Sequence, residues 1–452
     1  MEDEATGRHD DASALEHLRT LLRIPTVSRL DESRIDWARF DEFIYALEQL
    51  YPLVHRELVV DVVDGHALLM RWAGRQSGRE AVLMAHYDVV AADDPAAWTH
   101  PPFDAVVTGA GADAIVWGRG TLDDKGAVAA ILEAVEQLLG AGFVPEHDVY
   151  LSFGHNEETA GSGAASLVAE LASRGVSPRL VLDEGGAVIE KVFPGVRRPS
   201  AVVGVSEKGM ANISLTVEQS GGHASTPPRM TATVRLARAL VRLNARRFPA
   251  SLTAPNIEMI RTIGAHSTPL LRFVFTRVDT FRRPLLALFA RLSDETNAMV
   301  RTTAAVTQLR ASDSANALAE RAVAVVNTRI AIDSTVEKTL THIRRAIRDP
   351  LVVVAASTPS EPSPVSPSSG EAWQLISEAI SAVYPRAIVS PYVMLGASDA
   401  RHFTTISPFV YRFTPFEMSS DERATLHAID ERMHVGTFLS GIRFYRTLIE
   451  RL

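Results

Sequence analysis

The sequence predicts an α/β fold of two domains. Strand-like runs of β-branched residues alternate with amphipathic helical segments over the first 200 residues, which is typical of an open sheet flanked by helices. Acidic and histidine residues directly follow several of these runs, and ligands gather at the carboxyl ends of strands in such sheets. The length of 452 residues exceeds what one hydrophobic core usually serves, so a second domain is expected.

Two helices are predicted to open the chain, because apolar residues recur at helical spacing over Ala12 to Leu22 and over Trp37 to Leu50. Strands and helices then alternate. The predicted strands are Glu57 to Val63, Ala67 to Trp72, Glu80 to Met84, Asp148 to Phe153 and Leu180 to Leu182, and the predicted helices are Lys125 to Leu139 and Gly163 to Arg174.

The pattern changes near Gly204 to that of an α+β unit. A Ser/Pro-rich stretch, 357–369, ends this unit because proline-dense polar sequence resists regular structure. The expected domains are 1–205, 206–357 with a helical insertion at about 255–300, and 358–452, which resumes the first domain. The elements predicted beyond Gly204 are strands Met210 to Val217, Val323 to Ile332 and Leu351 to Ala355, and helices Ala232 to Arg246, Val336 to Ile347 and Glu371 to Val383.

Composition excludes several functions. The chain has no cysteine, so disulfides and thiolate chemistry are excluded and a metal site must use His, Asp and Glu. A net charge of −8 argues against a nucleic-acid partner. The acidic N-terminus does not resemble a signal peptide, which favours a cytoplasmic location. Charges interrupt the apolar segment Pro269 to Leu292, so no membrane span is expected. A helical hairpin packed on its own domain is the favoured interpretation, and a membrane-surface helix pair or an apolar substrate groove stays open.

Adjacent carboxylates at Glu157-Glu158 follow a strand-like run and point in different directions, so one can bind a metal while the other moves a proton. Alone, such a pair is more often a polar loop. Similar clusters of acidic and histidine residues occur elsewhere in the chain, so a shared site is the better interpretation. One of them, Asp123-Asp124, precedes a predicted helix and could by itself be a simple helix cap. These clusters are His86 with Asp88, Asp123-Asp124, Asp183-Glu184 and His427.

Nine motifs in order along the chain carry a resemblance to a known family. They are AHYDVV, GRGTLDDKG, GHNEETAGSGA, VLDEGG, SGGHASTPP, NALAE, VNTRI, GASDARHF and LHAIDER. The chain resembles the two-zinc exopeptidases and amidases that include aminoacylase, carnosinase, bacterial dipeptidases and carboxypeptidase S, and it is most similar to the carboxypeptidase S branch. The resemblance implies a catalytic domain with a mixed central sheet flanked by helices, and an inserted α+β, ferredoxin-like lid domain.

The resemblance also implies a catalytic centre with two divalent ions, of which Zn²⁺ is the expected metal and Co²⁺ or Mn²⁺ the alternatives. Glu157 would act as the general base on a water that bridges the ions, and Asp88 would orient His86. The implied metal ligands are His86, Asp123 and Asp183 for one ion, and Asp123, Glu158 and His427 for the other.

The implied substrates are dipeptides or N-acyl amino acids with a free carboxylate. His223 would stabilise the oxyanion, either within the chain or across a homodimer formed through the lid domain. Arg329 would grip the substrate carboxylate with a bidentate contact. The other implied substrate contacts are Asn316, Gly396, Ala397 and Ser398.

Some alternatives remain open at this point. His434 competes with His427 as a ligand, because the residue after His427 departs from the glycine that is usual in the branch. The role of His402, beside the GASD motif, is left open. The protein could also be a non-catalytic peptide-binding member, or an amidase or deacetylase of another small N-acyl metabolite, since one site can serve several chemistries.

Overall fold

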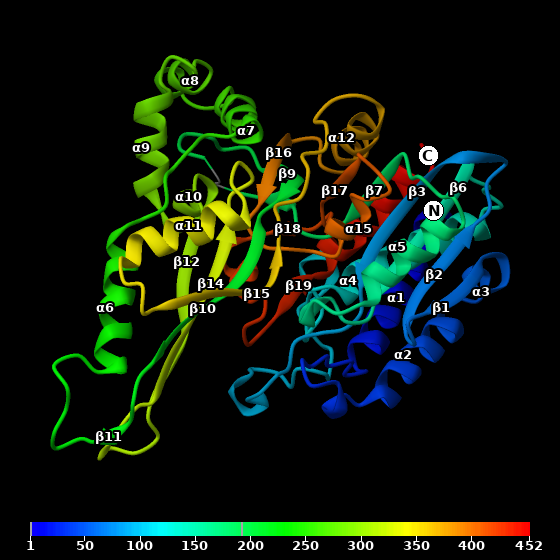
Figure 1. Ribbon diagram of the computed structural model, residues 1–452. Coiled ribbons are helices and arrows are strands. Elements are labelled where there is room, and N and C mark those ends of the chain that lie inside the picture. The colour runs from blue at the N-terminus through cyan, green and yellow to red at the C-terminus, as the bar shows by residue number, and fades with distance from the viewer. Residues whose placement is uncertain (1, 191–192) are drawn as a thin grey trace.

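The computed structural model describes residues 2–190 and 193–452 and consists of a larger unit and a smaller unit (Figure 1). The larger unit contains both ends of the chain and a mixed sheet flanked by helices. The smaller unit is formed by the middle of the chain and lies to the left of the sheet in Figure 1. We call these the catalytic unit and the lid. The α/β class with a mixed central sheet is therefore confirmed.

The central sheet has the strand order β1-β2-β6-β3-β7-β17-β9-β8-β18, with β16 also paired to β9. Its middle strands β6, β3, β7 and β17 are parallel, so their carboxyl ends meet at one edge. The strands are β1 (Val59–Val63), β2 (Ala67–Trp72), β3 (Gln76–His86), β6 (His147–Gly154), β7 (Leu180–Asp183), β8 (Ala187–Ile189), β9 (Ser200–Glu207), β16 (Ile388–Met394), β17 (Val410–Arg412) and β18 (Glu417–Met418).

Side chains that alternate along these strands build two apolar layers. Leu83 and Leu182 face the larger core, whereas Val82 and Val181 face a smaller one on the opposite side. The larger core is covered by α1 (Glu2–Leu22), α2 (Trp37–Leu50), α3 (Pro52–Glu57), α4 (Lys125–Gly140), α12 (Glu371–Val383) and α15 (Val435–Ile449), and the smaller by α5 (Gly163–Ser173) and α13 (Ala400–Phe403).

Short elements complete the catalytic unit. A small antiparallel sheet of order β19-β5-β4 connects the chain before α4 to the chain before α15. Its strands are β4 (Val106–Thr108), β5 (Ile115–Trp117) and β19 (Arg432–His434), and the remaining short helices are η1 (Glu32–Arg34), η2 (Pro95–Ala97), η3 (Gly111–Asp113), η4 (Glu157–Thr159) and α14 (Ser420–Arg423).

The lid is a four-stranded antiparallel sheet of order β12-β14-β10-β15 with two helices packed against it. Its chain order, strand-helix-strand-strand-helix-strand, is that of a ferredoxin-like fold. The elements are β10 (Gly209–Glu218), α6 (Ala232–Ala245), β12 (Thr303–Arg310), β14 (Arg321–Ile330), α11 (Val336–Ile347) and β15 (Val353–Ser360). A two-stranded ribbon, β11 (Gly222–His223) with β13 (Ala317–Leu318), extends from the far end of the lid (Figure 1).

A helical insertion between α6 and β12 packs against the catalytic unit. Its helices are α7 (Ala254–Gly264), α8 (Pro269–Phe275), α9 (Arg282–Leu292) and α10 (Asp294–Met299). Met259 and Phe289 of the insertion share one apolar cluster with Phe193, Val202 and Ile388 of the catalytic unit. This contact fixes the insertion beside β16 and β9, as Figure 1 shows.

The apolar segment Pro269 to Leu292 forms α8, α9 and the turn between them. Within the described residues, no helix combines the length and the apolar character needed to cross a membrane.

Candidate metal centre and active site

His86 ends strand β3 with its imidazole fully buried among carboxylates. Its Nδ1 lies 3.0 Å from the backbone oxygen of Asp88 and 3.3 Å from the carboxylate of Asp88, while its Nε2 lies 3.0 Å from Oδ1 of Asp123. Burial lowers the pKa of His86, but the hydrogen bonds to Asp123 and Asp88 outweigh it and raise this pKa well above its ordinary value. Asp88 thus fixes the ring so that Nε2 faces Asp123.

Asp123 lies between two imidazoles. Its Oδ2 is 2.8 Å from Nε2 of His427, which in turn is 3.1 Å from Oε2 of Glu158. Hydrogen bonds to these two carboxylates raise the pKa of His427 to about 10. A carboxylate shared by two histidines in this way is positioned to bridge two cations.

The structure differs from the prediction at Asp183. The alternation along β7 puts Asp183 on the face of Val181, which α13 covers, and its Oδ2 accepts a hydrogen bond of 2.8 Å from the backbone N–H of Ala400. The following residue, Glu184, turns toward the cluster, with Oε1 3.9 Å from Nε2 of His86. Glu184 therefore takes the place in the cluster that the sequence analysis gave to Asp183.

Two triads result, each with one ligand atom per residue within 4.8 Å of the others. They are His86, Asp123 and Glu184, and Asp123, Glu158 and His427. Within the described part of the chain, Oε1 of Glu158 is buried and has no hydrogen-bond partner. A buried carboxylate oxygen without a partner is costly unless a cation occupies the space beside it. This donor set of nitrogen and oxygen atoms fits divalent metals.

Glu157 lies next to the two triads, in the short helix η4. The carboxylate of Asp88 accepts the backbone N–H groups of Glu157 and Glu158, each at 3.1 Å, and so fixes the start of this helix. Burial raises the pKa of Glu157 well above its ordinary value, aided by the carboxylate of Asp399 and opposed by His86. A carboxylate with a raised pKa is suited to accept and then return a proton near neutral pH.

Glu431 supports the loop that carries Asp123, a role that the sequence analysis did not assign. Its buried carboxylate accepts the backbone N–H of Gly120 at 3.1 Å and that of Leu122 at 2.8 Å, and it pairs with Arg119 at 2.7 Å. The signal in the sequence was a second acidic residue soon after His427, but only the fold brings positions 119 and 431 together.

Asp399 is a second buried carboxylate beside the site that the sequence analysis passed over, although it belongs to the GASD motif. A Cβ at Gly154 would lie 2.8 Å from its Oδ2 and 3.5 Å from Cβ of His86, so a glycine is needed at the end of β6. Burial and the nearby Asp183 raise the pKa of Asp399 to about 8.

The loop Gly396-Ala397-Ser398 follows β16 and precedes Asp399, which lies beside Gly154 at the end of β6. The backbone N–H and the hydroxyl of Ser398 both donate to Glu207 at 3.3 Å. Glu207, at the end of β9, also pairs with Arg401 at 2.7 Å and with the buried Arg412 at 2.9 Å. This network holds the loop at the junction of the catalytic unit and the lid.

Arg329 lies near the end of strand β14 and is half-buried. Burial and the nearby Arg401 lower the pKa of Arg329, whereas the carboxylates of Glu207 and Glu157 act in the opposite direction. The guanidinium therefore lies within electrostatic reach of Glu157, on the lid side of the site.

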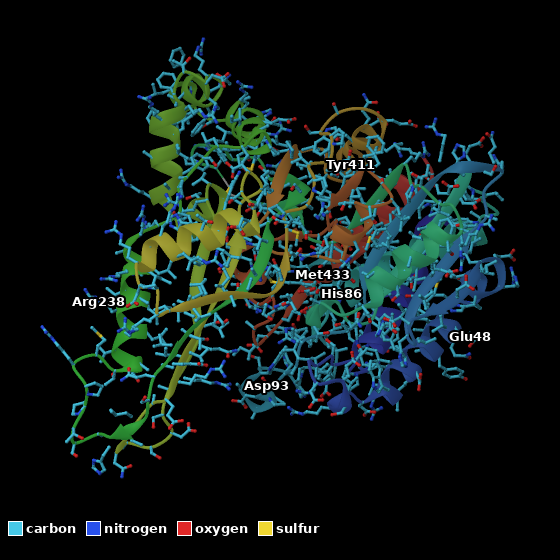
Figure 2. All side chains as sticks on the ribbon, viewed as in Figure 1. Glu48, His86, Asp93, Arg238, Tyr411 and Met433 are labelled. Atoms are coloured by element: carbon cyan, nitrogen blue, oxygen red, sulfur yellow. The ribbon has the colours of Figure 1, made fainter. Side chains whose placement is uncertain are left out.

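His223 and Asn316 lie far from the two triads of their own chain. His223 is exposed on β11, and the backbone oxygen of Asn316 accepts a hydrogen bond of 2.9 Å from Ala224 in the same ribbon. The ribbon occupies the lower left end of the molecule in Figure 1, while His86 lies near the middle of Figure 2, which has the same view. Two points that lie apart in one view are at least that far apart in the molecule. The fold therefore does not bring His223 and Asn316 to the site of their own chain.

His434 and His402 lie outside the two triads. His434, on β19, faces Glu422 at 3.7 Å, so the geometry favours His427 over His434. His402 lies on α13, where burial and Arg401 lower its pKa.

A family model described as "Peptidase family M20/M25/M40" matches residues 82–451, which include both triads and the lid. The chain belongs to this family. Membership makes the protein a metal-dependent hydrolase, and the recognition of the exopeptidase and amidase family from its motifs is confirmed.

Two relatives in this family match nearly the whole chain. The Dictyostelium discoideum "Probable carboxypeptidase S-like 2" is 32% identical over 425 residues, covering 93% of this chain and 80% of the relative. The human "N-fatty-acyl-amino acid synthase/hydrolase PM20D1" is 32% identical over 450 residues, covering 98% and 88%.

Solved structures of the family share the fold. The M20 family metallo-carboxypeptidase Sso-CP2 from Sulfolobus solfataricus has a TM-score of 0.71 at 16% identity, covering 97% of this chain and 98% of that one. Human carnosine dipeptidase 1 has a TM-score of 0.69 at 14% identity, covering 99% and 97%. At these identities the likeness concerns the fold alone.

Proposed function

We propose that the protein hydrolyses the amide bond of dipeptides or N-acyl amino acids with a free carboxylate, in the manner of a carboxypeptidase, dipeptidase or aminoacylase. The observation that carries the proposal is the pair of triads that share Asp123, with Glu157 beside them. The names of the relatives, carboxypeptidase S-like and N-fatty-acyl-amino acid hydrolase, point to the same substrate classes.

His86, Asp123 and Glu184 would hold one divalent ion, and Asp123, Glu158 and His427 the other. The nitrogen and oxygen donors suit Zn²⁺ best, with Co²⁺ and Mn²⁺ as alternatives. Such ions supply charge that polarises an amide carbonyl and lowers the pKa of a water molecule.

Glu157 performs the proton transfers in this proposal. It accepts a proton as a water oxygen adds to the amide carbon, and it returns that proton to the nitrogen as the carbon–nitrogen bond breaks. The products are a carboxylic acid and a free amine. Asp88 contributes by holding both His86 and the backbone of Glu157 in place.

Arg329 would bind the carboxylate of the substrate from the lid side, with the Gly396-Ala397-Ser398 loop beside it. A planar guanidinium can bind a carboxylate through two parallel hydrogen bonds. The electrostatic influence of Glu157 on Arg329 supports this placement, because the amide and the carboxylate of an N-acyl amino acid are separated by one carbon atom.

His223 and Asn316 would act on the site of a second copy of the chain in a homodimer formed through the lid. Strand β12 is an edge strand of the lid sheet, and its Val306 and Leu309 are exposed, as are Val234 and Val241 on α6. An unpaired edge with exposed apolar residues favours association. His223 would then stabilise the developing oxyanion in the partner.

A screen of dipeptides and N-acyl amino acids against Zn²⁺-loaded protein tests the function. Hydrolysis by the wild type and not by the Glu157→Gln variant is expected. A loaded protein that binds these compounds without cleaving any of them would contradict the proposal and favour a non-catalytic peptide-binding role. Cleavage restricted to other small N-acyl metabolites would favour the amidase or deacetylase alternative. A cytoplasmic location stays a prediction.

A further inference from the structure

We propose that a cavity between the helical insertion and the catalytic unit binds the acyl chain of a long-chain N-acyl amino acid. The inference rests on the proposed function, and it adds that the protein selects its substrates by their acyl group. The cavity has a volume of about 470 Å³, within the range of 300–1,000 Å³ that is typical of small-molecule sites.

Two residues that line the cavity are chain neighbours of candidate metal ligands. Gly185, one of its lining residues, directly follows Glu184, and Leu426, another, directly precedes His427. Gly185 has a φ of +119°, and a Cβ there would lie 2.5 Å from Sδ of Met394, so the chain needs a glycine to turn away from Glu184. The cavity therefore adjoins both triads of the centre.

Its walls come from two parts of the molecule. Ala187, Val202 and Tyr392 contribute from strands β8, β9 and β16 of the catalytic unit. Met259 of α7 and Phe289 of α9 contribute from the insertion. The insertion thus creates the cavity by docking beside the sheet, and without it these strands would expose apolar side chains.

The chemistry of the described lining residues suits a hydrocarbon chain. Most of them are aliphatic, aromatic or methionine side chains, which gain free energy by excluding water from an apolar ligand. Two of the charged residues that line the cavity, Glu295 of α10 and Arg423 of α14, pair with each other at 3.1 and 3.4 Å. Both are partly exposed, so this pair lies where the cavity meets solvent and joins the insertion to the segment before His427.

The proposed binding of the substrate carboxylate by Arg329 sets which end of the substrate enters the cavity. With the carboxylate bound by Arg329 on the lid side and the scissile carbonyl at the metal centre, the acyl group extends away from Arg329. Gly185 and Leu426 place the cavity next to the residues of the centre, and the catalytic unit and the insertion form its walls, so the acyl chain is the part that reaches it. Burial of each methylene group favours binding by about fourfold.

The test uses two matched variants in helix α9. Leu292 lines the cavity and is 49% exposed, whereas Leu288, one turn earlier, is 43% exposed and does not line it. In the Leu292→Asp variant a charge would face the acyl chain, which is unfavourable in an apolar environment. Leu288→Asp places the same charge outside the cavity.

The kcat/KM values of N-acetyl-, N-octanoyl- and N-palmitoyl-phenylalanine are measured with the metal-loaded wild type and both variants. The wild type is expected to favour the palmitoyl substrate over the acetyl one by at least about 100-fold, a modest part of what complete burial of the chain would give. Leu292→Asp is expected to lower this ratio by at least about tenfold, and Leu288→Asp to leave it unchanged. Equal kcat/KM values along the series in the wild type, or equal effects of the two variants, would overturn the inference.

A binding measurement separates this inference from the proposed function. Palmitate should displace a fluorescent fatty acid from the wild type and from Leu288→Asp, and more weakly from Leu292→Asp. Displacement with this pattern supports the cavity even if none of the amides is cleaved, an outcome that would refute only the proposed activity on these compounds. Absence of fatty-acid binding to the wild type would overturn the inference even if N-acetyl-phenylalanine is hydrolysed.

Discussion

Asp183 and Glu184 are consecutive residues whose carboxylates have different partners. Asp183 accepts the backbone N–H of Ala400 at 2.8 Å on one face of the sheet, while Glu184 lies 3.9 Å from Nε2 of His86 in the cluster of candidate ligands. The strand ends between them, so the alternation that points Asp183 toward α13 no longer governs Glu184.

The first prediction separates these two carboxylates. Glu184→Gln is expected to lower the metal content from two ions per chain to about one, because an amide is a weaker ligand than a carboxylate. Asp183→Asn is expected to retain both ions, since the amide oxygen can still accept the N–H of Ala400. Mass spectrometry of the metal bound to purified protein provides the measurement. Loss of an ion from Asp183→Asn alone would restore Asp183 as the ligand.

The second prediction concerns Glu157. Glu157→Gln is expected to lower kcat by about 10²–10⁴ or more, because the variant has no group to carry the proton from water to the leaving amine. The metal content should stay at the wild-type value, since Glu157 belongs to neither triad. A kcat close to that of the wild type, measured on any substrate found in the screen, would show that another residue moves the proton.

The third prediction concerns the buried pair of Arg119 and Glu431, whose atoms lie 2.7 Å apart. Glu431→Gln is expected to lower the free energy of unfolding by about 3–5 kcal/mol, because it leaves a buried guanidinium without its counter-charge. The exposed pair Arg446–Glu450 provides the control, and Glu450→Gln should cost less than about 1 kcal/mol. Urea unfolding of the two variants makes the comparison, and equal losses would contradict the structural role of Glu431.

The fourth prediction tests whether His223 acts across a dimer. His223→Ala and Glu157→Gln should each be nearly inactive alone. When the two variants are mixed at equal concentration and allowed to exchange subunits, the mixture should recover about one quarter of wild-type activity. Random pairing makes half of the dimers mixed, and each mixed dimer has one intact site of two. Sedimentation analysis establishes the dimer. A monomer, or a mixture that stays inactive, would count against the proposal.

Local sequence was sufficient to predict most elements. Helices α2, α11 and α12 have the predicted bounds because an unbroken 3.6-residue apolar pattern lies between clear stop signals. Strand β2 also has the predicted bounds, because its short run of apolar residues follows Asp64-Gly65 and precedes Gly74. Strand β3 is longer than predicted, from Gln76 to His86, because Gln76 pairs with His147 at one end, and Ala85 and His86 pair with Phe153 and Gly154 at the other, in a neighbouring strand that no local pattern reveals.

The motifs determined by themselves which residue types meet at the centre, since His86, Asp123, Glu158 and His427 each stand at the end of a strand or in a loop with a distinctive sequence. Only the tertiary structure decided between Asp183 and Glu184, because the choice depends on which face α13 covers. The tertiary structure also brings Glu431 into contact with the loop that carries Asp123, and it separates His223 from the site of its own chain. The cavity forms only where the insertion packs against the catalytic unit. Each of these depends on contacts between segments far apart in the chain, for which residue periodicity and spacing carry no information.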